Sequence, residues 1–288
     1  MSNQLVWLIT GCSSGIGYGL AAAALKRGDK VIATARARSI AKTAPLQQLG
    51  AHVLELDVTA PVDELNAKVQ QALGLHGRID VLVNNAGYIL VGAQEENTAE
   101  ETLHQFNTNV FSALNMSRAV LPHMRARKSG TIVWLGSIGS WRANPHGSIY
   151  GATKAMHRCL SESLNAEIRP LGLRSICIDL GYFRTSFLDP NNRAPYTNRI
   201  ADYKAITVPA DERWKSVNGK QPGDPAKAVE LMLDLVRGEG AAAGKDLPPV
   251  AYFGSDCVEA VKKSCQTTLQ RIEEWETVFS STDFPKSQ

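Results

Sequence analysis

The sequence predicts a doubly wound α/β fold with parallel strands, and three observations support this prediction. Apolar runs of strand length alternate with helix-length segments from one end of the chain to the other. These runs are continuously apolar and rich in β-branched residues, as in strands that are buried on both faces of a parallel sheet. The first run leads directly into a glycine-rich turn and a helix, which is how a βαβ unit with right-handed crossovers begins.

Seven runs have the length and composition of strands. In chain order they are 5–10 (LVWLIT), 30–35 (KVIATA), 52–58 (HVLELDV), 79–85 (IDVLVNN), 131–137 (TIVWLGS), 174–180 (RSICIDL) and 249–253 (PVAYF). Helices are predicted at about 15–27, 61–74, 99–127, 148–168, 226–237 and 255–279. Gly28 stands where the first helix would end, and Asp224-Pro225 has the N-cap and N1 residue types that begin a helix.

The stretch 186–224 lacks a periodic pattern and is rich in Pro, Asn and Gly. Four aromatic residues are scattered through it, namely Phe187, Tyr196, Tyr203 and Trp214. A connection of this length is unusual in a compact domain and usually serves a function. We therefore expect a single domain over 1–288, with a substrate-binding loop at about 186–224 and a helical extension at about 255–288.

Composition excludes several classes of protein. The 288 residues are 44% apolar and 20% charged, enough to bury a large core. A net charge of +3 without a block of like charges does not favour nucleic-acid binding. The five cysteines have no CxxC spacing, so neither a disulfide framework nor a metal site is expected. The segment MSNQLVWLIT does not resemble a signal peptide, and no apolar run reaches membrane-spanning length. We expect a cytoplasmic enzyme or binding protein.

The glycine-rich turn TGCSSGIG occupies residues 10–17. Glycines at a strand-turn-helix junction let backbone amides approach a pyrophosphate at the helix N-terminus. An ordinary βα turn is the alternative, but the position at the first βα junction favours a nucleotide. The cofactor-binding residues expected in this turn are Gly11, Ser13, Ser14, Gly15, Ile16 and Gly17.

The end of the second strand indicates which cofactor binds. An acidic residue here would contact the ribose hydroxyls of NAD, whereas an arginine accommodates a 2′-phosphate. The segment reads TARAR, with Ala35 at the acidic position, followed by Arg36 and Arg38. Two solvated loop arginines are the alternative. Since no acid competes, we predict NADP(H), with Arg36 on the phosphate.

Residues 147–155, GSIYGATKA, place Tyr150 and Lys154 one helical turn apart on the same face. Such a pair is either part of a solvated helix face or an arrangement in which an ammonium makes a phenol easier to ionise. The remaining motifs favour the second interpretation.

Taken together, TGCSSGIG, NNAG (84–87), NTNV (107–110), Ser137 and Tyr150-Gly-Ala-Thr-Lys154 resemble the short-chain dehydrogenases/reductases. The resemblance covers about residues 5–185, and the tail, with its FGSD and EEWE segments, is similar to that of longer fungal and bacterial members. It implies a seven-stranded Rossmann sheet and a homodimer or homotetramer. In the EEWE segment we expect a solvated helix face with Trp275 turned inward.

The resemblance also implies site residues. The catalytic tetrad would be Asn109, Ser137, Tyr150 and Lys154, with Tyr150 and Lys154 also at the cofactor. The other implied cofactor-binding residues are Asp57 and Val58 by the adenine, Asn84, Ala86 and Gly87 along the cofactor, and Gly181 and Thr185 near the carboxamide. One departure is visible, because the family commonly has Pro-Gly where this chain has Leu180-Gly181.

Carbonyl reduction by this site would need a proton donor, and a free phenol has a pKa near 10. We expect Lys154 to lower the pKa of Tyr150, Ser137 to hydrogen-bond the carbonyl oxygen, and Asn109 to hold a water that links Lys154 to solvent. The expected function is an NADP(H)-dependent carbonyl reductase or alcohol dehydrogenase acting on a medium-sized apolar or aromatic ketone or secondary alcohol, in secondary metabolism. A dehydratase or epimerase, or a non-catalytic NADP(H) sensor, are the alternatives.

Overall fold

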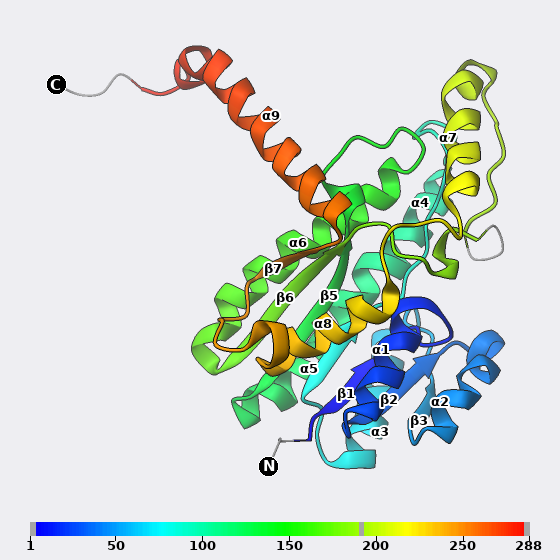
Figure 1. Ribbon diagram of the computed structural model, residues 1–288, viewed down its shortest axis with the longest axis vertical. Helices are drawn as coiled ribbons and strands as arrows, with labels where there is room; N and C mark the ends of the chain where they lie inside the picture. Colours follow the sequence, from blue (N-terminus) through cyan, green and yellow to red (C-terminus); the bar gives the residue numbers. More distant parts are fainter. Residues whose placement is uncertain (1–3, 190–192, 285–288) are drawn as a thin grey trace.

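The computed structural model describes residues 4–189 and 193–284 and confirms the α/β fold. In the described part, seven parallel strands form one sheet in the order β3-β2-β1-β4-β5-β6-β7, with helices on both faces (Figure 1). The strands are β1 (Val6–Ile9), β2 (Lys30–Ala35), β3 (His52–Glu55), β4 (Val81–Asn84), β5 (Gly130–Ser137), β6 (Leu173–Leu180) and β7 (Val250–Phe253). The order of strand addition reverses between β1 and β4, which is where open α/β sheets bind ligands.

The described helices are α1 (Gly15–Lys26), α2 (Ala44–Gln48), α3 (Val62–His76), α4 (Ala99–Phe106), α5 (Ser112–Arg127), α6 (Ser148–Ile168), α7 (Lys204–Val217), α8 (Pro225–Arg237) and α9 (Ser255–Ser280). Two apolar clusters show which helices cover which face. Residues of α1, α2 and α8 belong to the first cluster, and residues of α3, α5 and α6 to the second.

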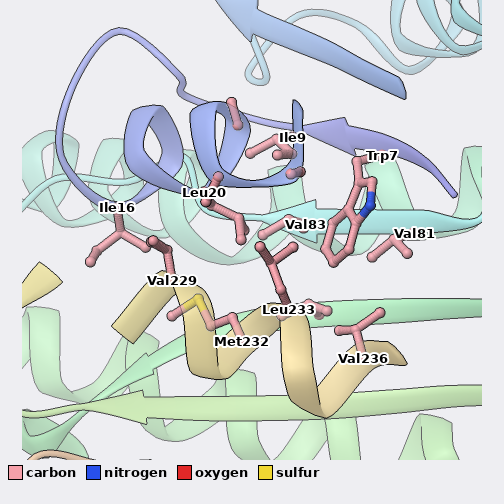
Figure 2. Packing of buried hydrophobic residues seen from close by; sticks show 14 of the residues in the cluster. Trp7, Ile9, Ile16, Leu20, Val81, Val83, Val229, Met232, Leu233 and Val236 are labelled. Atoms are coloured by element: carbon pink, nitrogen blue, oxygen red, sulfur yellow. The ribbon is translucent and has the colours of Figure 1, made fainter. Parts of the chain in front are cut away.

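Alternate residues of β1 belong to opposite clusters: Trp7 and Ile9 face α1 and α8, whereas Val6 and Leu8 face the other layer. Figure 2 shows the first layer, in which Leu20 of α1 and the apolar face of α8 meet over the sheet. Each such buried side chain contributes about 1.5–3 kcal/mol of transfer free energy. The two layers hold the carboxyl ends of the strands in a fixed arrangement.

The predicted helix boundaries hold at two points. Gly28 follows Arg27, the C-cap residue of α1, and has a φ of 86°, a left-handed value that suits glycine. Asp224 accepts hydrogen bonds from the backbone amides of Ala226 and Lys227 and so caps α8, with Pro225 as its first residue.

Two predicted elements differ in the structure, and one helix is additional. The helix expected over 99–127 is interrupted by a π-helical turn, Asn107–Phe111. The short helix α2 was not predicted. The stretch 186–224 is not irregular throughout, because it contains α7, which buries Thr207, Asp211 and Trp214. Two of these three buried residues are polar, and the helix contains Pro209. The sequence of α7 therefore shows no apolar periodicity.

The helix α9 extends away from the body of the molecule (Figure 1). Of its residues, Cys257 and Val261 in the first two turns are buried. The expectation that Trp275 turns inward is wrong, because half of its surface is exposed and its ring stacks on Phe279 instead. No helix within 4–189 and 193–284 combines the length and apolar character needed to span a membrane.

Candidate active site

A cavity of about 340 Å³ lies at the carboxyl ends of the strands. Its walls come from the glycine turn, from the residues that follow β2, β3 and β4, and from the ends of β5 and β6. Its size is within the usual range for small-molecule sites, and its position is at the switch point of the sheet. Fifteen of the predicted site residues line it, among them Gly11, Ser13, Ser14, Gly15, Ile16, Arg36, Asp57, Val58, Ala86, Gly87, Ser137, Tyr150 and Lys154. Gly181 and Thr185 line it as well.

The side chains of Asn85 and Thr10 hold the glycine turn against the end of β4, and the Thr10 hydroxyl accepts from the backbone amides of Asn85 and Ala86 (both 3.0 Å). The Asn85 amide donates hydrogen bonds to the backbone oxygens of Thr10 (2.6 Å) and Gly11 (3.0 Å). A Cβ at position 17 would lie 2.3 Å from Nδ2 of Asn85 and 2.8 Å from the oxygen of Gly11. Gly17 therefore does not line the cavity but lets the turn and Asn85 meet. Gly15, with a φ of 61°, begins α1 without an acidic residue in its first turn. This leaves a helix N-terminus suited to an anion.

Positive charge surrounds the end of β2. Arg36 lines the cavity, and partial burial followed by the neighbouring charge of Arg38 lowers the pKa of its guanidinium. Asp57 accepts hydrogen bonds from the backbone amide (2.9 Å) and hydroxyl (2.7 Å) of Thr59. Burial alone would raise the pKa of Asp57, but these hydrogen bonds and the two arginines lower it overall. The nearby charge of Asp57 opposes the lowering of the Arg36 pKa by burial and Arg38 only in part.

Asn84 does not take the predicted position along the cavity. Its side chain points toward α5, where Nδ2 donates to the hydroxyl of Ser117 (2.9 Å). The next residue, Asn85, lines the cavity in its place. The sequence could not distinguish the two because β4 is buried on both faces, so its pattern does not show which side chain faces the turn.

Asn109 also lies outside the cavity lining. Its Oδ1 accepts from the amide of Tyr88 (3.1 Å), and its Nδ2 donates to the oxygen of Tyr88 (3.0 Å) and to the hydroxyl of Thr153 (3.1 Å). These bonds make the side chain a clamp between the segment after β4 and α6. The role of holding a water with this side chain is therefore not supported by its contacts.

The structure brings Ser137, Tyr150 and Lys154 together in the wall of the cavity. Tyr150 and Lys154 lie on α6, are only 8% and 5% exposed, and have the Lys154 nitrogen 5.8 Å from the centre of the Tyr150 ring. The Lys154 ammonium donates to the oxygen of Leu135 on β5 (2.7 Å). Ser137 ends β5 and its Oγ accepts from the amide of Gly139 (3.0 Å), which leaves the hydroxyl proton available.

The pKa directions differ from the prediction. Burial raises the pKa of the Tyr150 phenol, and its hydrogen bond with Ser137 opposes this only in part. Burial also lowers the pKa of Lys154 to about 8. Burial outweighs the lowering of the Tyr150 pKa that we expected from Lys154, because both groups are desolvated and the ammonium is directed to Leu135. At neutral pH the phenol keeps its proton.

His157, one turn after Lys154, is a buried residue at this site that the sequence interpretation missed. Its Nδ1 lies 3.0 Å from the oxygen of Leu135, and its Nε2 contacts the oxygen of Asn109. Burial and the charge of Lys154 lower the pKa of His157 to about 3. The neutral ring lies between the carbonyl group that holds Lys154 and the π-helical turn, and it can donate its one N–H to only one of these two oxygens at a time. The sequence contained one indication of this position, because a residue three positions after Lys154 lies on the same face of a helix.

The turn after β6 is fixed by α9. A Cβ at Gly181 would lie 2.0 Å from Oδ1 of Asp256, and Oδ2 of Asp256 accepts from the amide of Tyr182 (2.7 Å). The backbone amide of Gly181 donates to the oxygen of Phe253 (2.8 Å). These contacts constrain the backbone of the turn. The turn is therefore held in place although Leu180 stands where the family commonly has proline.

The wall of the cavity beside Tyr150 contains large apolar side chains. Ile89, Phe187 and Trp214 line it and pack in one cluster with Tyr150. Behind Trp214, Asp211 of α7 forms a buried ion pair with Arg193 and also contacts Lys215 (2.9 Å). The predicted substrate-binding segment thus contributes a wall to the cavity and is fastened by its own ionic contacts.

Comparison with known proteins identifies the family. The model of the short chain dehydrogenase family matches residues 5–195. A protein of Bacteroides thetaiotaomicron called 3-ketodihydrosphingosine reductase is 37% identical over 204 residues, covering 70% of this chain and 72% of that one. Oxidoreductase BOA17 of Botryotinia fuckeliana is 30% identical over 274 residues, covering 94% and 96%. The crystal structure of a short-chain dehydrogenase from Streptomyces avermitilis has a TM-score of 0.86 and 34% identity, covering 98% of this chain and 100% of that one. The chain belongs to the short-chain dehydrogenase family.

Proposed function

We propose that the protein is an NADP(H)-dependent carbonyl reductase or alcohol dehydrogenase in which Tyr150 is the acid and base. The observation that carries this proposal is the cavity itself, because the glycine turn and Ser137, Tyr150 and Lys154 line the same space. The glycine cradle and the helix N-terminus fit a pyrophosphate. A bound nicotinamide cofactor would supply the hydride in reduction or accept it in oxidation.

The side chains have complementary roles. Because burial raises the pKa of Tyr150, the phenol is protonated at neutral pH and can donate its proton to a carbonyl oxygen. The Ser137 hydroxyl can donate a hydrogen bond to the same oxygen as negative charge develops there. Lys154, held by Leu135, supplies positive charge that favours the phenolate left after transfer.

The apolar wall favours a medium-sized apolar or aromatic ketone or secondary alcohol. Ile89, Phe187 and Trp214 offer large nonpolar surfaces beside Tyr150. Similarity to a protein named 3-ketodihydrosphingosine reductase supports a ketone as the substrate class.

A binding experiment tests the choice of cofactor. We expect NADPH to bind more tightly than NADH, because Arg36 lies in the cavity wall and no acid stands at Ala35. Losing one or two charge-assisted hydrogen bonds of about 1.5–3 kcal/mol each should weaken NADPH by roughly ten- to several-hundredfold in Arg36→Ala. NADH, which has no 2′-phosphate, should be nearly unaffected.

Arg38→Ala is the matched control, since Arg38 carries the same charge outside the cavity lining. Its effect on NADPH should stay within about fivefold, as for a screened surface charge. A wild-type protein that prefers NADH, or an Arg36→Ala variant with unchanged NADPH affinity in calorimetric titration, would contradict the assignment.

A further inference from the structure

The extending part of α9 has an apolar face that no described part of the protein covers. Leu269, Ile272, Trp275 and Phe279 are between 45% and 58% exposed, although side chains of this size are usually buried. Exposed apolar residues that gather on one helix mark an interaction surface, whereas scattered ones do not.

This face continues the one by which α9 packs on the body. Cys257 and Val261 are buried there in a cluster with Ile138. From Val261 onward, steps of four and three residues lead through Cys265, Thr268, Ile272, Trp275 and Phe279. Such spacing is that of a coiled-coil seam. At about 1.5 Å per residue, the stripe from Val261 to Phe279 is about 27 Å long.

The charges on α9 indicate what covers the stripe. The extending part of α9 is basic in its first half and acidic in its second half, and it has no net charge. The basic residues are Lys262, Lys263 and Arg271, and the acidic residues are Glu273, Glu274 and Glu276. Helices that lie on anionic membranes are instead rich in lysine and arginine. If two copies of α9 paired in parallel, each charged segment would lie beside a segment of the same sign. Antiparallel pairing places the basic segment of each helix beside the acidic segment of the other.

We propose that a second copy of this chain covers the stripe, through antiparallel pairing of two α9 helices about a two-fold axis. In this arrangement the Phe279 end of one helix lies beside the Val261 end of the other. The interface is isologous, as in most homodimers. It is independent of the chemistry proposed for the cavity, because none of the residues of the stripe lines that cavity.

Sedimentation equilibrium of the full chain tests the proposal. Ile272→Lys should raise the dissociation constant of the assembly at least tenfold, equivalent to about 1.4 kcal/mol. Gln270→Lys introduces the same charge on the polar side of the helix and should leave the dissociation constant unchanged. In dilute solution, where the assembly is dissociated and both positions are exposed, both variants should keep the thermal midpoint of the wild type. Equal masses for the wild type and Ile272→Lys at every concentration would overturn the proposal.

Two further measurements test the orientation and the partner. Lys262→Glu should weaken the assembly, and adding Glu276→Lys to it should restore the affinity, since antiparallel pairing brings these positions together. Parallel pairing in register would place Cys265 beside its copy, so a disulfide-linked dimer through Cys265 on mild oxidation would overturn the antiparallel arrangement. A wild-type monomer that binds vesicles of phosphatidylcholine and phosphatidylserine through Ile272 would show that the face is a membrane surface instead.

Discussion

Replacing Gly17 by alanine perturbs the contact that shapes the cofactor cradle. The new methyl group would lie 2.3 Å from the Asn85 amide nitrogen, which holds the oxygens of Thr10 and Gly11. Displacing that amide removes two hydrogen bonds, worth about 0.5–1.5 kcal/mol each, and overpacking adds about 1–3 kcal/mol. Alanine regains about 1 kcal/mol of helix propensity. The expected net loss is roughly 1–5 kcal/mol.

Gly19→Ala is the control, because its Cβ would meet only Val229 at an ordinary 3.5 Å in the same helix. At about 2 °C per kcal/mol for a chain of this size, Gly17→Ala should lower the thermal midpoint by roughly 2–10 °C. Gly19→Ala should raise it slightly. Calorimetric titration should also show weaker NADPH binding by Gly17→Ala alone. A Gly17→Ala protein with the midpoint and NADPH affinity of Gly19→Ala would refute the role assigned to Asn85.

Two other predictions concern buried ionisable groups. Burial and the charge of Lys154 lower the pKa of His157 from 6.5 to about 3. Between these two values the unfolded chain binds a proton at His157 that the folded protein does not. The free energy of unfolding is therefore highest above about pH 6.5 and decreases as the pH falls toward 3. Urea unfolding of His157→Leu should show a shallower fall over this range, by up to about 1.4 kcal/mol per pH unit, and parallel curves would contradict the assignment. Asp211→Ala leaves the buried Arg193 without its carboxylate, at a cost of about 3–5 kcal/mol. Amide exchange in α7 should then accelerate while exchange in β5 stays slow, and unchanged exchange in α7 would show that the ion pair does not fasten this segment.

Local patterns predicted much of the fold and part of the site. The glycine turn and the four-residue step from Tyr150 to Lys154 are set by neighbouring residues, so both could be found in the sequence and both line the cavity. All seven strands were also predicted, because buried parallel strands are continuous apolar runs.

Features that depend on distant contacts could not be predicted in the same way. Whether Asn84 or Asn85 faces the glycine turn depends on the twist and packing of β4. The helix α7 is stabilised by an ion pair to Arg193 and by burial of Trp214, not by an apolar stripe. The direction of the pKa shift of Tyr150 depends on burial of the phenol, which the spacing to Lys154 does not reveal.

Single-turnover reduction by Tyr150→Phe tests the central claim most directly. The substitution removes one hydroxyl group, so the folded state and NADPH affinity should be retained, while the rate with a ketone that the wild type reduces should fall by at least about 10² to 10⁴. Tyr182→Phe is the control, because this tyrosine also lines the cavity but its hydroxyl bonds to Arg142 (2.8 Å). The account predicts a large loss in Tyr150→Phe and a small one in Tyr182→Phe. A Tyr150→Phe rate equal to that of Tyr182→Phe would contradict the assignment of Tyr150 as the proton donor.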